Sequence, residues 1–141
     1  FEGVLGSCGP VNSGYVNAGH EMPFVYRRET NTYEAYKIRA GFVLAGIEDI
    51  VYKEQKLQLN IGDKIFQYTD GVTEATDKDR QLYGMDRLDH VLNQQCLSSN
   101  PEETLKLVKA DIDAFVGDND QFDDITMLCL EYTKKMENQR L

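Results

Sequence analysis

The sequence contains few of the residues on which disulfides and zinc sites depend. Its three cysteines, Cys8, Cys96 and Cys129, are odd in number, far apart and form no CxxC pair. This pattern predicts reduced, mostly buried thiols and a cytoplasmic location. The two histidines, His20 and His90, are too few for a zinc cage.

Long apolar runs and an excess of positive charge are also absent from the sequence. No apolar run approaches the length of a membrane span, and no charged start followed by an apolar core marks a signal peptide. The net charge of −9 argues against nucleic acid or an anionic membrane as the main partner. The acids gather in residues 70–79 and 118–124. Clustered carboxylates without histidine or cysteine favour hard cations such as Mg²⁺ or Mn²⁺.

The length and composition indicate one globular domain. The chain has 141 residues, 41% hydrophobic and 28% charged, with no internal repeat or linker. We expect the domain to span residues 1–132, followed by a polar tail at 133–141. The first residues, FEGVL from Phe1, have the character of a strand rather than of a natural start. We therefore expect the chain to be a piece of a longer protein.

Alternating apolar and polar residues predict strands in the first two thirds of the chain. The predicted strands are SGYVNAG, PFVYR, TYEAYKI after the polar turn ETN, IVYKEQKLQLNI, and KIFQYT after Gly62-Asp63. The Gly-Asp turn predicts an antiparallel hairpin between the last two of these. Near the end of the chain, ITMLCLEY is almost continuously apolar, which predicts a strand in the centre of a sheet.

Two segments of the last third have helical periodicity. MDRLDHVLNQQ places apolar residues at helical spacing from Met85 to Leu92. A second helix is predicted from Asn100 as N-cap, Pro101 at the first position and Glu103 closing a capping box, with Gly117 as its end. The chain as a whole predicts an α+β domain with antiparallel sheet pairing.

Asp70 stands where a predicted strand ends, in YTDGVTEATD. Asp-Gly after a strand is a common turn signal, since Asp caps its own backbone and Gly tolerates positive φ. The alternative is that the strand end holds the carboxylate rigidly in order to bind a ligand. The segment alone is compatible with both interpretations.

The position of Asp123 bears on this choice. Asp70 follows one predicted strand and Asp123 precedes another, so antiparallel pairing of the two strands would place both at one sheet edge. Converging carboxylates repel, and close to an apolar sheet this repulsion is costly unless a cation lies between them. A divalent metal would resolve the repulsion.

Other catalytic and metal-binding motifs do not fit. DNDQFDDI has Phe122 at the third ligand position of an EF-hand loop and lacks the following glycine. Neither Cys8 nor Cys96 is followed by the arginine of a cysteine phosphatase, and no P-loop or GxSxG motif is present. A lone histidine beside a glycine at a strand end, such as His20, is interpreted as structural.

Four segments together resemble a known family. VNAGHEMPFVYR, LQLNIGDKIFQYTDGVTEATD, YGMDRL and FDDITMLCLEY are similar to the PP2C class of metal-dependent protein phosphatases, in its bacterial branch typified by stage II sporulation protein E. The similarity covers nearly the whole chain in the correct order. Its most specific feature is GD-x(6)-DGVTEA followed at a distance by DDIT. The resemblance favours the metal-binding interpretation of Asp70.

The resemblance implies an α-β-β-α sandwich of antiparallel sheets flanked by helices, of which this chain would be the C-terminal part. It also implies two Mn²⁺ or Mg²⁺ ions whose bridging water attacks phosphoserine or phosphothreonine, without a covalent intermediate. In this bacterial branch the substrates are often phosphorylated anti-anti-sigma regulators. The implied setting is therefore cytoplasmic signalling.

The family's site residues map onto five positions of this chain. Asp70 and Asp123 match metal ligands, and Gly71 permits close backbone approach. Glu74 and Asp124 are weaker candidates, either beside the ligands or at an extra metal site. No catalytic residue is implied beyond the metal ligands.

The family's other metal aspartates, including a GD-x-x-D-type motif, would lie upstream of Phe1. We therefore expect this piece alone to be inactive, and exposed sheet edges to favour a homodimer. The alternative hypothesis is a non-catalytic interaction module with the same fold.

Overall fold

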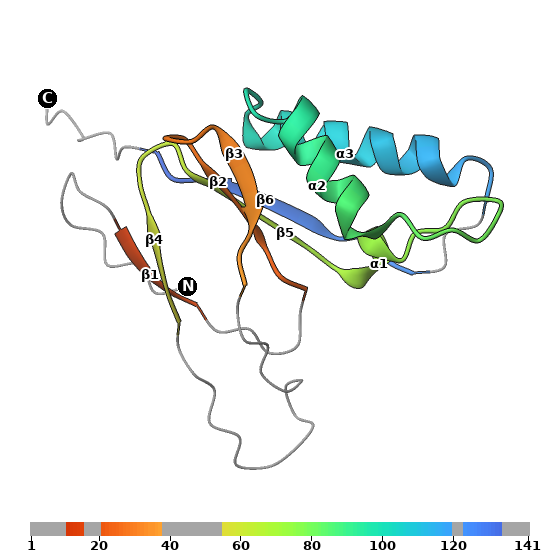
Figure 1. Ribbon diagram of the computed structural model, residues 1–141, viewed down its shortest axis with the longest axis horizontal. Helices are drawn as coiled ribbons and strands as arrows, with labels where there is room; N and C mark the ends of the chain where they lie inside the picture. Colours follow the sequence, from red (N-terminus) through yellow and green to blue (C-terminus); the bar gives the residue numbers. More distant parts are fainter. Residues whose placement is uncertain (1–10, 16–20, 38–54, 120–122, 134–141) are drawn as a thin grey trace, which may run out of the picture.

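The computed structural model describes residues 11–15, 21–37, 55–119 and 123–133. These residues form two antiparallel sheets and a layer of helices (Figure 1). The larger sheet has the order β3-β2-β5-β6, and the smaller one pairs β1 with β4. The strands are β1 (Val11–Tyr15), β2 (Phe24–Arg27), β3 (Thr32–Ala35), β4 (Gln55–Leu59), β5 (Lys64–Tyr68) and β6 (Met127–Glu131). The helices are α1 (Asp70–Thr73), α2 (Gly84–Gln95) and α3 (Pro101–Val116).

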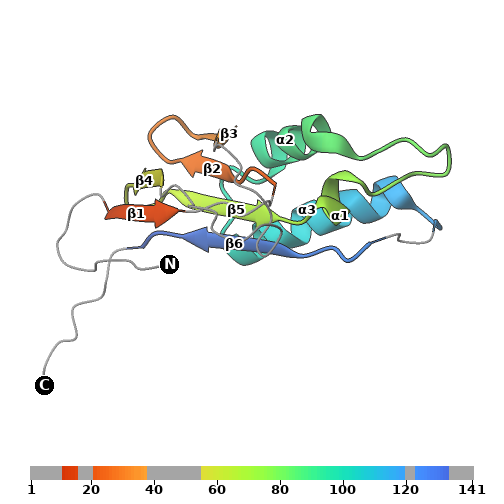
Figure 2. The ribbon, with the colours of Figure 1, turned by 90° about the horizontal axis from the view of Figure 1, so that it is seen from below.

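The four-stranded sheet is packed on both faces. Helices α2 and α3 cover one face (Figures 1 and 2), where Phe24 and Phe66 are buried together with Leu88 and Leu92. Each such side chain contributes about 1.5–3 kcal/mol through burial. On the opposite face a separate cluster joins Val25 and Ile65 to Leu57 and Leu59 of β4. This arrangement confirms the predicted antiparallel sandwich flanked by helices.

Both long helices form where the sequence predicts them. The Asn100 side chain accepts the Glu103 N–H at 2.9 Å, and the Glu103 carboxylate accepts the Asn100 N–H at 3.1 Å, so the capping box is present. The helix ends at Gly117, whose φ of 63° favours glycine. No helix in the described ranges is long and apolar enough to span a membrane.

The buried thiols were also predicted correctly for two of the three cysteines. Cys96 and Cys129 are free and buried, and burial raises the pKa of each thiol to about 11. A buried thiol with a raised pKa is a poor nucleophile. Cys8 and His20 lie outside the described residues.

The predicted hairpin around Gly62-Asp63 is wrong. The strands predicted on either side of ETN are present as β2 and β3, and they pair antiparallel with each other. Strand β4 pairs with β1, while β5 pairs with β2 and β6. The turn carries the chain from one sheet to the other. Asp63 fixes this crossing, because its buried carboxylate accepts the N–H groups of Asn60 and Arg28, each at 3.0 Å.

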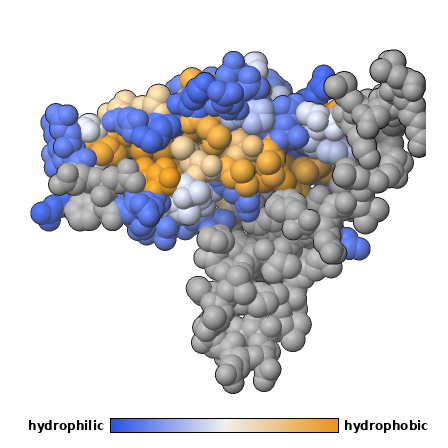
Figure 3. Space-filling view, turned by 180° about the vertical axis from the view of Figure 1, so that it is seen from behind, coloured by the Kyte–Doolittle hydropathy of each residue, from blue (hydrophilic) through white to orange (hydrophobic). Residues whose placement is uncertain are grey.

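For the part of the sheet that the structure describes, the prediction of a central position for β6 is also wrong. Within the described sheet β6 is the edge strand next to β5. Its apolar residues divide between two faces: Cys129 packs toward the helices, whereas Leu128 and Leu130 are 45% and 42% exposed. Figure 3 shows an apolar band on the rear of the molecule, the side on which β6 forms the edge. A continuous apolar run therefore does not by itself distinguish a central strand from an edge strand.

Candidate functional site

Strands β5 and β6 bring the two acidic segments together. They pair antiparallel with Tyr68 opposite Met127, so the chain leaves β5 and enters β6 at the same edge of the sheet (Figure 1). Asp70 opens the short helix α1 directly after β5, and Asp123 precedes β6. The neighbouring antiparallel strands that the sequence argument required are therefore present.

Thr69 cross-links the two segments. Its N–H donates to the Thr126 carbonyl at 3.0 Å, and its hydroxyl donates to the Asp124 carbonyl at 3.0 Å while accepting the Thr126 N–H at 3.1 Å. Sequence reasoning missed this residue. The available signal was a hydroxyl side chain immediately before Asp-Gly at a strand end, where it can bond to neighbouring backbone.

Gly71 lies against the backbone of the opposite segment. A Cβ added to Gly71 would lie 2.6 Å from the Asp124 carbonyl oxygen and 3.0 Å from its carbon. Real Cβ atoms essentially never approach so closely. The contact therefore requires glycine, and it fixes the position of Asp124 relative to Asp70.

Substitution Gly71→Ala should force these two segments apart. We expect it to lower the free energy of unfolding by about 1–3 kcal/mol, the usual cost of overpacking. Urea unfolding would measure this change. A Gly71 variant as stable as the wild type would show that the backbone approach is not tight.

The two aspartates are solvent-exposed, and a backbone N–H orients each of them. Asp70 Oδ1 accepts the Gly71 N–H at 3.1 Å, and Asp123 Oδ1 accepts the Asp124 N–H at 2.7 Å. The Asp70 carbonyl is held by the Thr73 hydroxyl at 3.2 Å and the Glu74 N–H at 2.8 Å. Among the described residues, none donates a hydrogen bond to the second carboxylate oxygen of Asp70. That oxygen is available to a ligand.

The chemical type of the donor atoms at this end of the sheet suits a hard cation. They are carboxylate oxygens, the ligands that Mg²⁺ and Mn²⁺ prefer. Across the described ranges no three acidic, histidine or cysteine side chains form a group that could hold a metal ion. Glu74 and Asp124 are both exposed and do not complete such a group with Asp70 and Asp123. These residues therefore account for only part of a coordination sphere.

The YGMDRL segment serves the helix layer. The Tyr83 hydroxyl donates to Asp111 at 2.9 Å, and Arg87 Nε donates to the same carboxylate at 2.8 Å, which ties α2 to α3. Burial and the neighbouring Asp111 carboxylate raise the pKa of Tyr83. Phe115 packs edge-on against the Tyr83 ring. This motif supports the packing between the sheet and its helices. It is not part of the acidic edge, the name used here for the end of the sheet where Asp70 follows β5 and Asp123 precedes β6.

The chain is similar to sequences of one bacterial family. The sequence model of stage II sporulation protein E (SpoIIE) matches residues 9–133. Protein IcfG of Synechocystis is 29% identical over 119 residues, which cover 84% of this chain and 18% of IcfG. The phosphoserine phosphatase RsbU of Bacillus subtilis is 34% identical over 119 residues, covering 82% of this chain and 33% of RsbU. The chain thus spans a third or less of the length of these curated relatives.

The fold is shared with solved phosphatase domains. A structure of the PP2C phosphatase domain of SpoIIE from Bacillus subtilis, with a fragment of its regulatory domain, aligns with a TM-score of 0.72 and 13% identity. The alignment covers 90% of this chain and 36% of that one. The match over residues 9–133 and the shared sandwich show that this chain belongs to the SpoIIE family and has the fold of part of a PP2C phosphatase domain.

Proposed function

We propose that the protein carrying this chain is a Mn²⁺- or Mg²⁺-dependent phosphatase that hydrolyses phosphoserine or phosphothreonine in proteins. The observation that supports the proposal is that β5, which Asp70 follows, ends at the same sheet edge at which β6, which Asp123 precedes, begins, in a SpoIIE-family chain. The similarity to RsbU, a phosphoserine phosphatase, supports this class of substrate.

In this proposal Asp70 and Asp123 are metal ligands. Bound Mn²⁺ or Mg²⁺ would supply a water of lowered pKa and positive charge for the phosphate oxygens. The chain's own contribution is to hold the carboxylates in place: Gly71 N–H orients Asp70, and Thr69 keeps the two segments in register. Other parts of the protein would provide the remaining ligands, because the described acids do not complete the set. Glu74 and Asp124 would lie beside the ligands.

The substrate and setting follow from the same assignment. We propose a phosphorylated protein of the anti-anti-sigma type as substrate, acted on in the cytoplasm. Carboxylate and water ligands accept both cations, so either ion would support the reaction.

Phosphate release from a phosphoserine peptide by the full-length protein tests the proposal. We expect release that requires Mn²⁺ or Mg²⁺ and stops with a chelator. The incomplete acid group favours one other candidate, an interaction module that uses the fold without catalysis. Absence of release with either metal, together with binding of the peptide, would contradict the phosphatase proposal and favour the module.

We also propose that the β6 edge mediates self-association. Leu128 and Leu130 are exposed on an edge strand, a combination that favours pairing with a second chain. Sedimentation should show a dimer at high protein concentration, and Leu128→Lys combined with Leu130→Lys should yield a monomer. A wild-type protein that stays monomeric at every concentration would contradict this prediction.

A further inference from the structure

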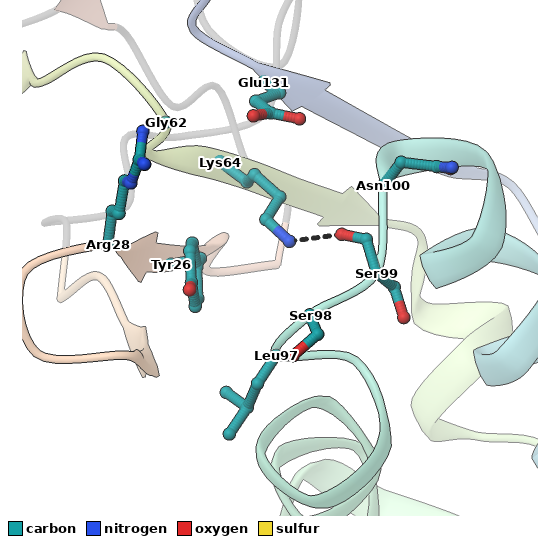
Figure 4. Close-up of a pocket in the computed structure, with 9 residues that line it drawn as sticks. All are labelled: Tyr26, Arg28, Gly62, Lys64, Leu97, Ser98, Ser99, Asn100 and Glu131. Atoms are coloured by element: carbon teal, nitrogen blue, oxygen red, sulfur yellow. Dashed lines mark hydrogen bonds between the residues drawn. The ribbon is translucent and has the colours of Figure 1, made fainter.

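A second site lies at the end of β5 opposite the acidic edge. Lys64 begins β5 and Asp70 follows its other end, about 20 Å away at the usual rise of a strand. Here a pocket of about 360 Å³ opens between β2, β5, β6 and the loop that joins α2 to α3 (Figure 4). The residues of its wall that carry the argument are Tyr26, Arg28, Lys64, Ser98, Ser99 and Glu131.

Lys64 is a buried cation that forms no ion pair with the described residues. Lys64 is only 4% exposed, and its ammonium extends into the space between Tyr26 and Ser99 (Figure 4). Nζ donates to the Ser99 carbonyl at 2.5 Å and lies 4.4 Å from the centre of the Tyr26 ring. A buried charge of this kind is costly unless an opposite charge accompanies it.

The rim of the pocket supplies further donors. Arg28 is exposed, and its guanidinium takes part in no hydrogen bond or ion pair with the described residues. Its stem lies against Gly62, where an added Cβ would be 2.5 Å from Arg28 Cδ. Ser98 adds a hydroxyl group, whereas the Ser99 hydroxyl donates to the Gln95 carbonyl. Figure 4 shows the Arg28 guanidinium at the rim beside Gly62, while the Lys64 ammonium lies deeper, next to Ser99. Donors of this kind are suited to a carboxylate or another oxyanion.

The charges around the pocket favour an anion of single charge. Lys64 and Arg28 contribute two positive charges, and Glu131, which lies across from Lys64 on β6, contributes one negative charge. The net charge of +1 is matched by a monoanion, whereas a phosphate dianion would leave an excess negative charge next to Glu131. The volume is near the lower limit for small-molecule pockets. We propose that this pocket binds a small carboxylate ligand, with its carboxylate at Lys64 and with Arg28 adding positive charge at the rim.

Calorimetric titration of the full-length protein with benzoate tests the proposal, with uncharged benzamide as the matched probe. We expect benzoate to bind at least tenfold more tightly than benzamide, and Lys64→Met to lower its affinity at least tenfold. Lys56→Met, at an exposed lysine of β4, is the control and should bind as the wild type does. Arg28→Gln should also weaken the binding of benzoate. Because Arg28 is exposed, this variant should fold, and it replaces the Lys64 variant in the test if that one does not fold.

The location and charge preference can be tested in the same protein. With a chelator present to exclude metal-mediated binding, amide NMR shifts on adding benzoate should lie at Ser98–Asn100 and not at Asp70–Gly71. Glu131→Gln should raise the affinity for inorganic phosphate, because it removes the opposing carboxylate. Equal affinity for benzoate and benzamide, no binding of benzoate, or shifts confined to the acidic edge would overturn the proposal.

Discussion

Substitution Asp70→Asn should lower metal-dependent phosphate release by the full-length protein at least about 100-fold, because loss even of residues that support metal ligands costs 10–100-fold. The amide keeps the size of the side chain and can still accept the Gly71 N–H through its oxygen, so the fold should be retained. Its missing negative charge removes a hard-cation ligand. Initial rates with a phosphoserine peptide at saturating Mn²⁺, together with circular dichroism, would measure both effects.

Asp79→Asn is the matched control for this experiment. Asp79 is an exposed acid close in sequence to Asp70, but it lies in the turn after α1 and borders neither β5 nor β6 in the sequence. The same change of charge there should leave the rate within about twofold, since screening weakens exposed charges that are far apart. Equal losses in both variants would indicate a general charge effect, and an unchanged Asp70 variant would remove Asp70 from the site.

The largest expected effect on stability is at Asp63. This residue is only 1% exposed and accepts hydrogen bonds from the N–H groups of Asn60 and Arg28, and from Arg27 Nη1 at 2.9 Å. Asp63→Asn would place amide hydrogens against some of these donors and remove the ion pair. We expect it to lower the free energy of unfolding by about 3 kcal/mol at pH 7, measured by urea unfolding.

The effect of Asp63 should depend on pH in a defined direction. Burial raises the pKa of its carboxyl, but the Asn60 and Arg28 N–H groups and the Arg27 guanidinium lower it more, so the net pKa is below the ordinary 3.8. A lowered folded-state pKa stabilises the protein above the unfolded-state pKa, and this stabilisation is lost as the pH falls through the folded-state value.

The difference in free energy of unfolding between the wild type and Asp63→Asn should therefore have its full size at pH 7 and become smaller below about pH 4. Glu102→Gln is the control. It removes an exposed ion pair with Lys106 on α3, and its stability should match that of the wild type. A difference at Asp63 that is independent of pH would show that its charge does not stabilise the crossing between the sheets.

Local signals in the sequence were sufficient to predict the two long helices, α2 and α3, but not the short α1. The capping box of α3 depends on residues three positions apart, and Gly117 ends the helix through its own backbone conformation. The strands on either side of the polar turn ETN were equally local predictions, although their pairing as β2 and β3 was not predicted. These features arise from interactions between near neighbours in the chain.

The errors arose where distant segments decide the outcome. Gly62-Asp63 has the sequence of a hairpin turn, but Arg27 and Arg28 of the β2 segment hold Asp63 so that the turn joins two sheets. The edge position of β6 likewise depends on which strands lie beside it. Periodicity identifies a strand but does not identify its partner.

The acidic edge was predictable in outline because it required only that two strands be antiparallel neighbours. The role of Thr69 was not, since its hydroxyl bonds to Asp124, which is 55 residues away in the chain. Lys64 at the start of a strand gave no indication of burial, because its surroundings come from β2 and the loop before α3.

The most direct test of the central claim is the Mn²⁺ dependence of phosphate release in the full-length wild type, Asp70→Asn, Asp123→Asn and the double variant. If both carboxylates hold the same metal centre, each single variant should require far more Mn²⁺, and the double variant should be little worse than either single one. Additive effects would indicate separate sites. An unchanged Mn²⁺ requirement in either single variant would contradict the assignment of the acidic edge as the metal centre.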